Sequence, residues 1–430
     1  MPSWINWAGN QQSKPVRIER PASELEVVEV VRRAVAERLR VKVVGSGHSF
    51  TGIAVPDEVM IDLTRMNRFV NVDHTRGVIT VQAGIVLSDL NAYLELHQLS
   101  MPNLGDVTYQ TIAGSLSTST HGTGQGRTGL AAQVVGFRLI DASGNVLQCS
   151  NFENEEVFHV GRVGLGALGV LSTLTLRVVP AFQLCAVEEP MRVRDVLANI
   201  DQLVNDNHFF EFYWIPHTGW ALTKRNNICD LPSDPPRRFA HWWNKIFMEN
   251  IAFGALCYLG RMRPGLIPRL AKVLPSTGRV EYVNASYKIF ASTRLVRFYE
   301  MEYSINRESV VPALQRVMKL VDDEGLLLNF PVEVRFTAPD DVSLSTSYGR
   351  SSAYIAVHVF KGMQYEPYFR AVEKIMMDYG GRPHWGKIHF QSAESLSSLY
   401  PEYQRFIEVR NRLDPEGVFT NDYLRRVLGR

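Results

Sequence analysis

The sequence Gly45-Ser46-Gly47-His48-Ser49 follows directly on a short apolar stretch, residues 41–44, that predicts a β-strand. Glycines let the backbone approach a phosphate or a ring closely, and successive N–H groups in such a loop can bind an anion. Where nucleotide-binding loops normally carry a lysine or a bare helix start, this loop carries His48, which suits a bond to a cofactor better than a metal site. Taken alone, the stretch is more often a tight turn around a structural histidine.

Neither of the two common nucleotide-binding motifs matches this loop. A Rossmann fingerprint requires a third glycine three residues after the second, and that position is Phe50. A P-loop requires Gly-Lys-Ser or Gly-Lys-Thr, which does not occur near residues 45–49. The loop therefore belongs to another kind of site.

Composition sets limits on the class of protein. The 430 residues are 45% hydrophobic and 21% charged, with a net charge of +2, so the chain is long enough for two or three domains and nothing demands nucleic acid as a partner. The four cysteines lie far apart, which argues against a zinc site or a disulfide framework and fits a reducing cytoplasm: Cys149, Cys185, Cys229 and Cys257. No signal peptide is visible, and the longest apolar run, 251–260, is too short to span a bilayer. We expect a cytoplasmic protein.

The first 180 residues predict alternating helices and strands. A capping box of Ser23 and Glu26 begins a helix over 23–39, and leucines at helical spacing predict a second helix from 87 to about 99. The remaining elements are strands 59–63 and 171–179, hairpins 69–73/78–83 and 134–141/146–150, and a short helix near 153–160.

Residues 100–126 follow no periodic pattern, and residues 111–124 are small, hydroxyl-rich and glycine-rich. Long irregular stretches inside a compact domain are usually functional, and small side chains let the backbone pass close to a ligand. A flexible linker is the alternative. Because Leu104, Ile112 and Leu116 are interleaved and ordered strands follow, we favour a loop that cradles a ligand.

Residues 181–380 are rich in aromatic side chains and predict a second domain. In its predicted strand 329–336, period-two alternation places Glu333 and Arg335 on one face and three apolar side chains on the other. Such a pair is by default a solvated ion pair, but it is also what holding a polyhydroxylated substrate requires. Two further stretches, His384-Trp385-Gly386-Lys387 and the turn at 414–419, are not specific alone.

Together these stretches resemble the vanillyl-alcohol-oxidase type of flavoprotein, in its aldonolactone oxidoreductase branch. The resemblance covers nearly the whole chain and rests on motifs in family order: Trp7-Ala8 with Pro15, 45–49, 105–124, 164–170, 331–335, 384–387 and 414–419. It implies an α+β fold, with a two-part FAD-binding domain (1–180), an inserted substrate-binding cap built on an antiparallel sheet (181–380), and a C-terminal segment that returns to the flavin (381–430).

The resemblance also implies a set of site residues. His48 matches the histidine that many members bond covalently to the flavin 8α-methyl. Glu333, Arg335, Lys387 and Ser115 match positions at the reacting centre: Glu333 would accept the substrate proton, with His384 as the alternative base, and no metal is implied. The cofactor-binding positions are Val44, Gly45, Ser46, Gly47, His48 and Ser49, then Gly105, Thr111, Ala113, Gly114, Ser115, Ser117, Thr118, Thr120, His121 and Gly122, then Gly169, Val170 and Lys387.

The implied reaction is FAD-dependent oxidation of a sugar lactone, of the L-gulono-1,4-lactone kind. The electron acceptor is a cytochrome, a quinone-like molecule or oxygen, and we favour a dehydrogenase in which the Ala113 methyl group blocks oxygen. An alditol or aldonolactone oxidase and a non-catalytic flavin carrier are the alternatives, and the intact Glu333, Arg335 and Lys387 argue against the carrier. Residues 242–274 mix aromatic and basic side chains, which is typical of a membrane-surface contact or, more often, of a packed cap helix.

Overall fold

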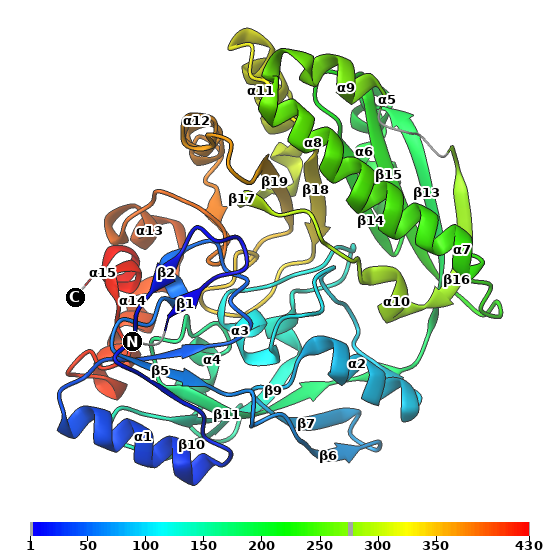
Figure 1. Cartoon of the computed structure of the whole chain (residues 1–430). Helices are drawn as coiled ribbons and strands as arrows, with labels where there is room; N and C mark the ends of the chain where they lie inside the picture. The colour runs from blue at the N-terminus through cyan, green and yellow to red at the C-terminus, as the bar shows by residue number, and fades with distance from the viewer. Residues whose placement is uncertain (1–2, 274–277, 430) are drawn as a thin grey trace.

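The computed structural model describes residues 3–273 and 278–429. Its N-terminal part holds a parallel three-stranded sheet and an antiparallel five-stranded sheet (Figure 1). The parallel sheet has the order β3-β5-β4, with β3 Arg17–Glu19, β4 Val41–Val44 and β5 Val59–Asp62. The antiparallel sheet has the order β10-β9-β11-β7-β6, with β6 Phe69–Asp73, β7 Val78–Gln82, β9 Val134–Ile140, β10 Val146–Ser150 and β11 Val170–Arg177. The predicted strands and both predicted hairpins are confirmed.

Helix α1, Glu24–Ala36, begins as predicted, because the Ser23 side chain accepts a hydrogen bond from the Glu26 N–H at 3.3 Å. It buries Val27, Val31 and Ala34, whereas Leu25 is exposed. Helix α2, Leu87–Leu96, is shorter than predicted. Gln98 takes a left-handed conformation, with φ 56°, and turns the chain into strand β8, Leu99–Ser100.

The segment predicted as irregular contains a short helix, α3, Ile112–Ser117. Thr111 caps it by accepting a hydrogen bond from the Gly114 N–H at 3.3 Å. Ile112 and Leu116 anchor the helix in the core, and the rest of residues 100–126 has little regular structure. Helix α4, Glu155–Gly161, lies where a short helix was predicted.

The second part of the chain is built on an antiparallel eight-stranded sheet of order β16-β13-β15-β14-β18-β19-β17-β20. Its strands are β13 Gln183–Arg192, β14 Phe209–Trp214, β15 Trp220–Cys229, β16 Val280–Ala285, β17 Phe298–Asn306, β18 Val332–Thr337, β19 Ser352–Phe360 and β20 Arg382–Pro383. One face packs against helices α11, Val310–Asp323, and α12, Glu366–Met377. Helices α5 Val193–Ala198, α6 Ile200–Asn205, α7 Arg238–His241, α8 Phe253–Met262, α9 Ile267–Val273 and α10 Ser286–Phe290 lie around the sheet (Figure 1).

The expectation that no cysteines pair is wrong for Cys185 and Cys229, which form a disulfide with a Cα–Cα distance of 6.1 Å. Strands β13 and β15 pair so that Cys185 lies opposite Asn227, two residues from Cys229. Separation in sequence hides this pair, because only the strand register brings the two sulfur atoms together. Cys149 and Cys257 are free and buried.

Two hydrophobic cores underlie this arrangement. The first joins side chains of the N-terminal sheets to the C-terminal helices α13 Ala393–Leu399, α14 Tyr403–Leu413 and α15 Asp422–Leu428. The second joins the eight-stranded sheet to α11 and α12, and it also takes in Ala8 and Phe50. Division of the chain at residues 180 and 380 stays a prediction.

Candidate functional site

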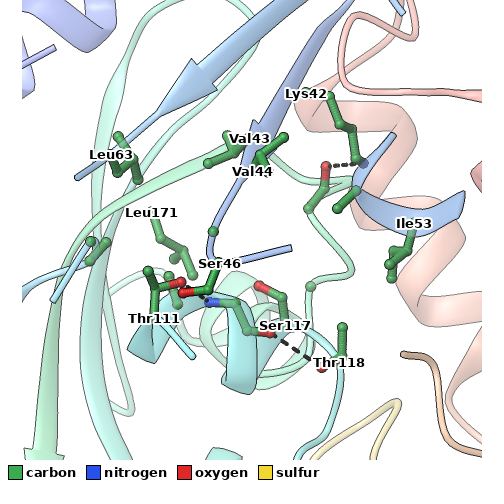
Figure 2. Close-up of a pocket in the computed structure, with 18 of the residues that line it drawn as sticks. Lys42, Val43, Val44, Ser46, Ile53, Leu63, Thr111, Ser117, Thr118 and Leu171 are labelled. Atoms are coloured by element: carbon green, nitrogen blue, oxygen red, sulfur yellow. Dashed lines mark hydrogen bonds between the residues drawn. The ribbon is translucent and has the colours of Figure 1, made fainter. Parts of the chain in front are cut away.

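A cleft in the N-terminal part is lined by the loop after β4, by helix α3 and by the glycine-rich stretch before β11 (Figure 2). The predicted cofactor-binding residues that line it are Val44, Gly45, Ser46, Gly47, His48, Ser49, Thr111, Ala113, Gly114, Ser117, Thr118 and Gly169. The structure therefore brings the two separate sequence motifs to one place. Gly45 packs against the Thr111 side chain, where a β-carbon would clash with the Thr111 hydroxyl.

The other predicted cofactor residues are not part of this lining: Gly105, Ser115, Thr120, His121, Gly122, Val170 and Lys387. Gly105 and Gly122 pack against neighbouring backbone, and a β-carbon at Gly122 would clash with it. Val170 is the first residue of β11. Ser115 is fully buried, and its hydroxyl donates to the Ile112 carbonyl at 2.8 Å, so its role beside the substrate stays a prediction. The Thr120 hydroxyl is buried and has no hydrogen-bond partner among the described residues.

Sequence reasoning missed Lys42, which lines the same cleft from strand β4 (Figure 2). Its side chain is almost fully buried and donates to the carbonyl of Gly166 at 3.0 Å. Burial lowers the pKa of Lys42 to about 7, although Asp414 opposes the shift. A lysine inside an apolar strand pattern is the signal that could have found it.

The loop after β4 has the donors that a pyrophosphate requires. The backbone N–H groups of residues 46–49 donate no hydrogen bond to any part of the chain that the structure describes. Gly47, with φ 67°, adopts the left-handed conformation that lets successive N–H groups point in one direction. These residues therefore fit the phosphate groups of a dinucleotide cofactor such as FAD.

His48 lies at the end of this loop and stacks on Trp7, with ring centroids 5.7 Å apart. Burial, together with the positive charge of Lys387, lowers the pKa of His48 to about 4. The imidazole is therefore neutral near pH 7, the form in which a ring nitrogen has a free electron pair. Lys387 itself lies over the Phe50 ring, 5.2 Å from its centroid.

A second cluster lies on one face of the eight-stranded sheet, where strand register places polar side chains opposite one another. Tyr213 on β14 pairs with Glu333 on β18, and Glu300 on β17 pairs with His358 on β19. On β18 the apolar side chains point to the opposite face, as the alternation predicted, and belong to the core with α11 and α12: Val332, Val334 and Phe336. Pairing alone thus assembles a polar face.

Glu333 and Arg335 are buried, not solvated, with 5% and 7% of each residue exposed, and they form an ion pair. Arg335 also contacts Glu211 at 2.9 Å and Asp106 at 3.5 Å, and Asp106 pairs with Arg294. Burial raises the pKa of the Glu333 carboxyl, and this outweighs the charge of Arg335. Glu333 is thus the acid of the cluster that takes up a proton most readily. At Asp106 the charges of Arg294 and Arg335 outweigh burial, and the pKa of that carboxyl is lowered.

The third predicted catalytic residue, Lys387, is joined to this cluster by two residues that sequence reasoning missed. Lys387 pairs with Glu300, and His358 Nε2 lies 3.5 Å from Glu300 and 4.0 Å from Glu333. Burial would raise the pKa of Glu300, but the charge of Lys387 holds it at about 2. Acidic residues at alternate positions of an apolar strand, Phe298–Asn306, are the signal that could have found Glu300.

His121 and His384 meet a third buried acid, Glu302, with ligand atoms all within 4.8 Å of one another. His121 Nε2 lies 3.2 Å from Glu302, and its Nδ1 lies 2.8 Å from the Gly122 carbonyl. His384 Nδ1 accepts a hydrogen bond from the Gly386 N–H at 3.1 Å, so its other nitrogen carries the proton and offers no pair to a metal. Burial lowers the pKa of His384 to about 3, which disfavours it as a base.

Known proteins resemble this chain over its whole length. Residues 15–150 match the FAD binding domain family, and residues 174–427 match the D-arabinono-1,4-lactone oxidase family. L-gulono-1,4-lactone dehydrogenase of Mycobacterium tuberculosis is 45% identical over 100% of this chain and 99% of its own, and L-gulonolactone oxidase of Bos taurus is 36% identical over 98% and 97%.

Among solved structures, a solvent-stable cholesterol oxidase superimposes with a TM-score of 0.86 at 19% identity, covering 100% of this chain and 97% of its own, which concerns the fold alone. These matches confirm the expected fold class and FAD as the cofactor. With a family model matching more than half of its length, the chain belongs to the D-arabinono-1,4-lactone oxidase family and carries an FAD-binding domain.

Proposed function

We propose that this protein oxidises a CH–OH group of an aldono-1,4-lactone, of the L-gulono-1,4-lactone kind, to a carbonyl group. The observation that carries the proposal is the buried ion pair of Glu333 and Arg335, on the polar face that also holds Glu300, the ion-pair partner of Lys387. The names of the most similar relatives support the substrate class. FAD, when bound, supplies the acceptor for the hydride that leaves the substrate carbon.

In this proposal Glu333 accepts the proton of the substrate hydroxyl. Its Oε1 accepts a hydrogen bond from the Tyr213 hydroxyl at 2.9 Å, which leaves Oε2 as the atom available to the substrate. The raised pKa of Glu333 suits a general base, because a base acts best when its pKa lies near the working pH. The low pKa of His384 makes that residue the weaker candidate.

Arg335 and Lys387 supply fixed positive charge where negative charge develops on the oxygen that loses its proton. Neither side chain is free to move, because carboxylates hold both of them: Arg335 is bound by Glu211 and Glu333, and Lys387 by Glu300. A preorganised charge in a water-poor site stabilises a developing anion without reorganisation. His48, neutral and at the end of the cleft, is the residue that we propose bonds covalently to the cofactor.

The electron acceptor distinguishes a dehydrogenase from an oxidase, and we propose a dehydrogenase. Ala113 lines the cleft on helix α3, so its methyl group can exclude oxygen from the ring of the cofactor. The alternative is an oxidase of aldonolactones or alditols. An alditol oxidase from Streptomyces, which is 30% identical to this chain, supports that alternative. A non-catalytic flavin carrier would not require the buried cluster around Glu333.

No helix in residues 3–273 or 278–429 combines the length and the apolar character needed to cross a lipid bilayer. We propose a peripheral contact instead, through the predicted aromatic and basic stretch, of which residue 274 lies outside the described residues. Trp242 and Trp243 are 46% and 43% exposed, and Phe239 is 74% exposed beside Arg237 and Arg238. Co-sedimentation with anionic vesicles, lost in a Trp242→Ser/Trp243→Ser variant, tests this contact; equal recovery of both proteins would remove it.

A substrate panel tests the proposed reaction. Under anaerobic conditions, aldonolactones should bleach the bound flavin, and alditols should do so more slowly. Each reduced sample is then mixed with oxygen or with a dye acceptor. Bleaching by no lactone would exclude the proposed function, and preferential bleaching by alditols would favour the alternative.

A further inference from the structure

A second hollow, a surface groove of about 490 Å³, lies between helix α8 and the adjoining ends of strands β17 and β19. It is separate from the FAD cleft and shares none of its lining residues. Tyr299 and Phe360 form aromatic walls. Ile251, which lies just before α8, and Leu295 and Val296, which lie before β17, complete these walls. The groove can therefore take a flat, largely apolar molecule.

Three cations line this groove: Arg261, Arg297 and Lys361. None of the three forms an ion pair within residues 3–273 and 278–429, and the lining contains no carboxylate. The Arg261 side chain is held in place, because it donates to the Lys361 carbonyl at 3.1 Å and packs against Gly362, where a β-carbon would clash with it. Three uncompensated positive charges in one hollow favour a ligand that carries negative charge.

A chain of packed aromatic rings connects the groove to the FAD cleft. The Phe360 ring is 6.4 Å from the Phe330 ring, and the Phe330 ring is 5.3 Å from the Phe298 ring, between centroids. The Phe298 ring is 5.4 Å from the Trp7 ring, and the Trp7 ring is 5.7 Å from the His48 ring, between centroids. Lys361 also packs against Gly9, two residues from Trp7. Electrons cross a protein more readily when the gap between redox groups is short, and this chain of rings joins the groove to the cleft.

We propose that this groove binds the electron acceptor, and that the acceptor is a planar quinoid molecule bearing negative charge. The proposal rests on the proposed function, since the two electrons are those released when the substrate CH–OH becomes C=O. The quinone gains these two electrons and two protons and leaves as the hydroquinone, so that the enzyme returns to its oxidised state. Arg261, Arg297 and Lys361 hold the anionic group, and Tyr299 and Phe360 hold the ring.

Binding is measured first, without turnover, by isothermal titration of the oxidised holoenzyme with 1,4-naphthoquinone-2-sulfonate and with neutral 1,4-naphthoquinone. The sulfonate should bind more tightly, and its affinity should fall as salt is raised. An Arg261→Gln/Arg297→Gln variant should bind it about tenfold more weakly, because each exposed charge contributes about threefold. The matched control is Arg177→Gln, an exposed arginine on β11 outside both hollows. Equal affinity for both quinones, or equal affinity of variant and wild type, would overturn the proposal.

Reoxidation is measured next, by stopped flow, on holoenzyme reduced with dithionite, so that no lactone is needed. The double variant should react with the sulfonate about tenfold more slowly than wild type at subsaturating quinone, and with the neutral quinone at an unchanged rate. Equal slowing with both quinones would mean that the arginines support the fold, and would reject the groove as an acceptor site. Failure of all lactones to reduce the enzyme would reject the proposed function and leave these two results standing.

Discussion

The Tyr213 hydroxyl lies between two carboxylates, 2.9 Å from Glu333 Oε1 and 3.1 Å from Glu211 Oε1. It has one proton and donates it to the ionised form of either acid. Strand pairing of β14 with β18 fixes the contact, since Tyr213 and Glu333 lie directly opposite each other. Tyr213 therefore stabilises the ionised form of Glu333 through this hydrogen bond, whereas burial acts in the opposite direction.

Replacing this tyrosine should shift the pH dependence of turnover. In Tyr213→Phe the ionised Glu333 loses a donor, so its pKa, already raised by burial, rises further. A hydrogen bond to a charged group contributes about 1.5 kcal/mol, which is about one pH unit. The acidic limb of the kcat/KM profile should move up by about that amount. Tyr282→Phe, which removes a 3.2 Å bond to Glu188 on the same sheet, should leave the profile in place; a shift in both variants would contradict the prediction.

Glu333→Gln should reduce kcat/KM by roughly 100- to 1000-fold, because the substrate proton loses its acceptor. Arg335→Met and Lys387→Met should also lower kcat/KM, because each variant loses a fixed positive charge. The flavin absorbance spectrum and Tm report whether each variant is folded and loaded. Glu188→Gln serves as the control, since Glu188 is a half-buried acid of the same sheet that pairs with Lys245. Near-normal kinetics in all three site variants would remove the proposed site.

His48 should retain FAD after the protein is denatured. The pKa of His48, about 4, keeps its imidazole ring neutral at pH 7, and His48 lines the cleft. Acid precipitation should therefore leave the yellow colour in the pellet for wild type and for a His74→Ala control, which changes an exposed loop histidine. His48→Ala should release the flavin to the supernatant. Colour found wholly in the wild-type supernatant would give His48 a structural role.

Ala113→Gly should speed the reaction of reduced enzyme with oxygen while changing little with a dye acceptor. The reason is that Ala113 lines the cleft, and a methyl group beside the bound cofactor ring would block oxygen while leaving hydride transfer intact. Stopped-flow reoxidation of the two proteins measures the effect, and Ala132→Gly, away from the cleft, is the control. An unchanged rate would clear Ala113 of this role, and a fast wild-type reaction would make the protein an oxidase.

Asp340 should make the fold less stable as pH rises. Burial raises its pKa to about 6, above the ordinary value of 3.8, although Ser345 donates to it at 2.6 Å. Between these two pH values the folded state binds more protons than the unfolded state, so stability falls by at most about 1.4 kcal/mol per pH unit. As the pH rises from 4 to 6.5, the free energy of unfolding of Asp340→Asn should therefore increase relative to that of wild type. Urea unfolding at each pH measures this difference.

The neighbouring residue provides a control of opposite sign. Asp341 pairs with Arg162 at 2.8 Å, and this hydrogen bond lowers its pKa although burial opposes the shift. Asp341 therefore stabilises the fold above its ordinary pKa, and this stabilisation is lost as pH falls. The free energy of unfolding of Asp341→Asn should fall furthest below that of wild type near pH 7. If the stability of Asp340→Asn and of Asp341→Asn changed with pH in the same way, both assignments would be contradicted.

Local sequence predicted those elements that local rules determine. The cap at Ser23 and the alternation in residues 332–336 describe interactions within one segment, and both appear as predicted. The early end of α2 depends on the single left-handed residue Gln98, a type that carries no strong turn signal. Helix α3 is short and rich in small residues, so its apolar repeat is too brief to detect.

The site divides in the same way. Residues in contiguous motifs, such as 45–49, could be predicted from the sequence and the resemblance, and they line the cleft. Tyr213 and His358 could not, because each reaches its partner through the register of two strands far apart in sequence. The alternation of acids in residues 298–306 points to Glu300 itself, but not to its partners. The Cys185–Cys229 pair was missed for this reason as well.

The first core is completed by residues from both sides of the eight-stranded sheet in sequence, and this determines when it can form. Val31 and Ile61 share it with Phe406 and Leu424. During synthesis the N-terminal sheets leave the ribosome hundreds of residues before their C-terminal partners do, so their apolar face stays uncovered while the eight-stranded sheet is made. The first core is therefore completed only after translation has passed residue 424, and premature termination within the eight-stranded sheet would yield a chain prone to aggregate.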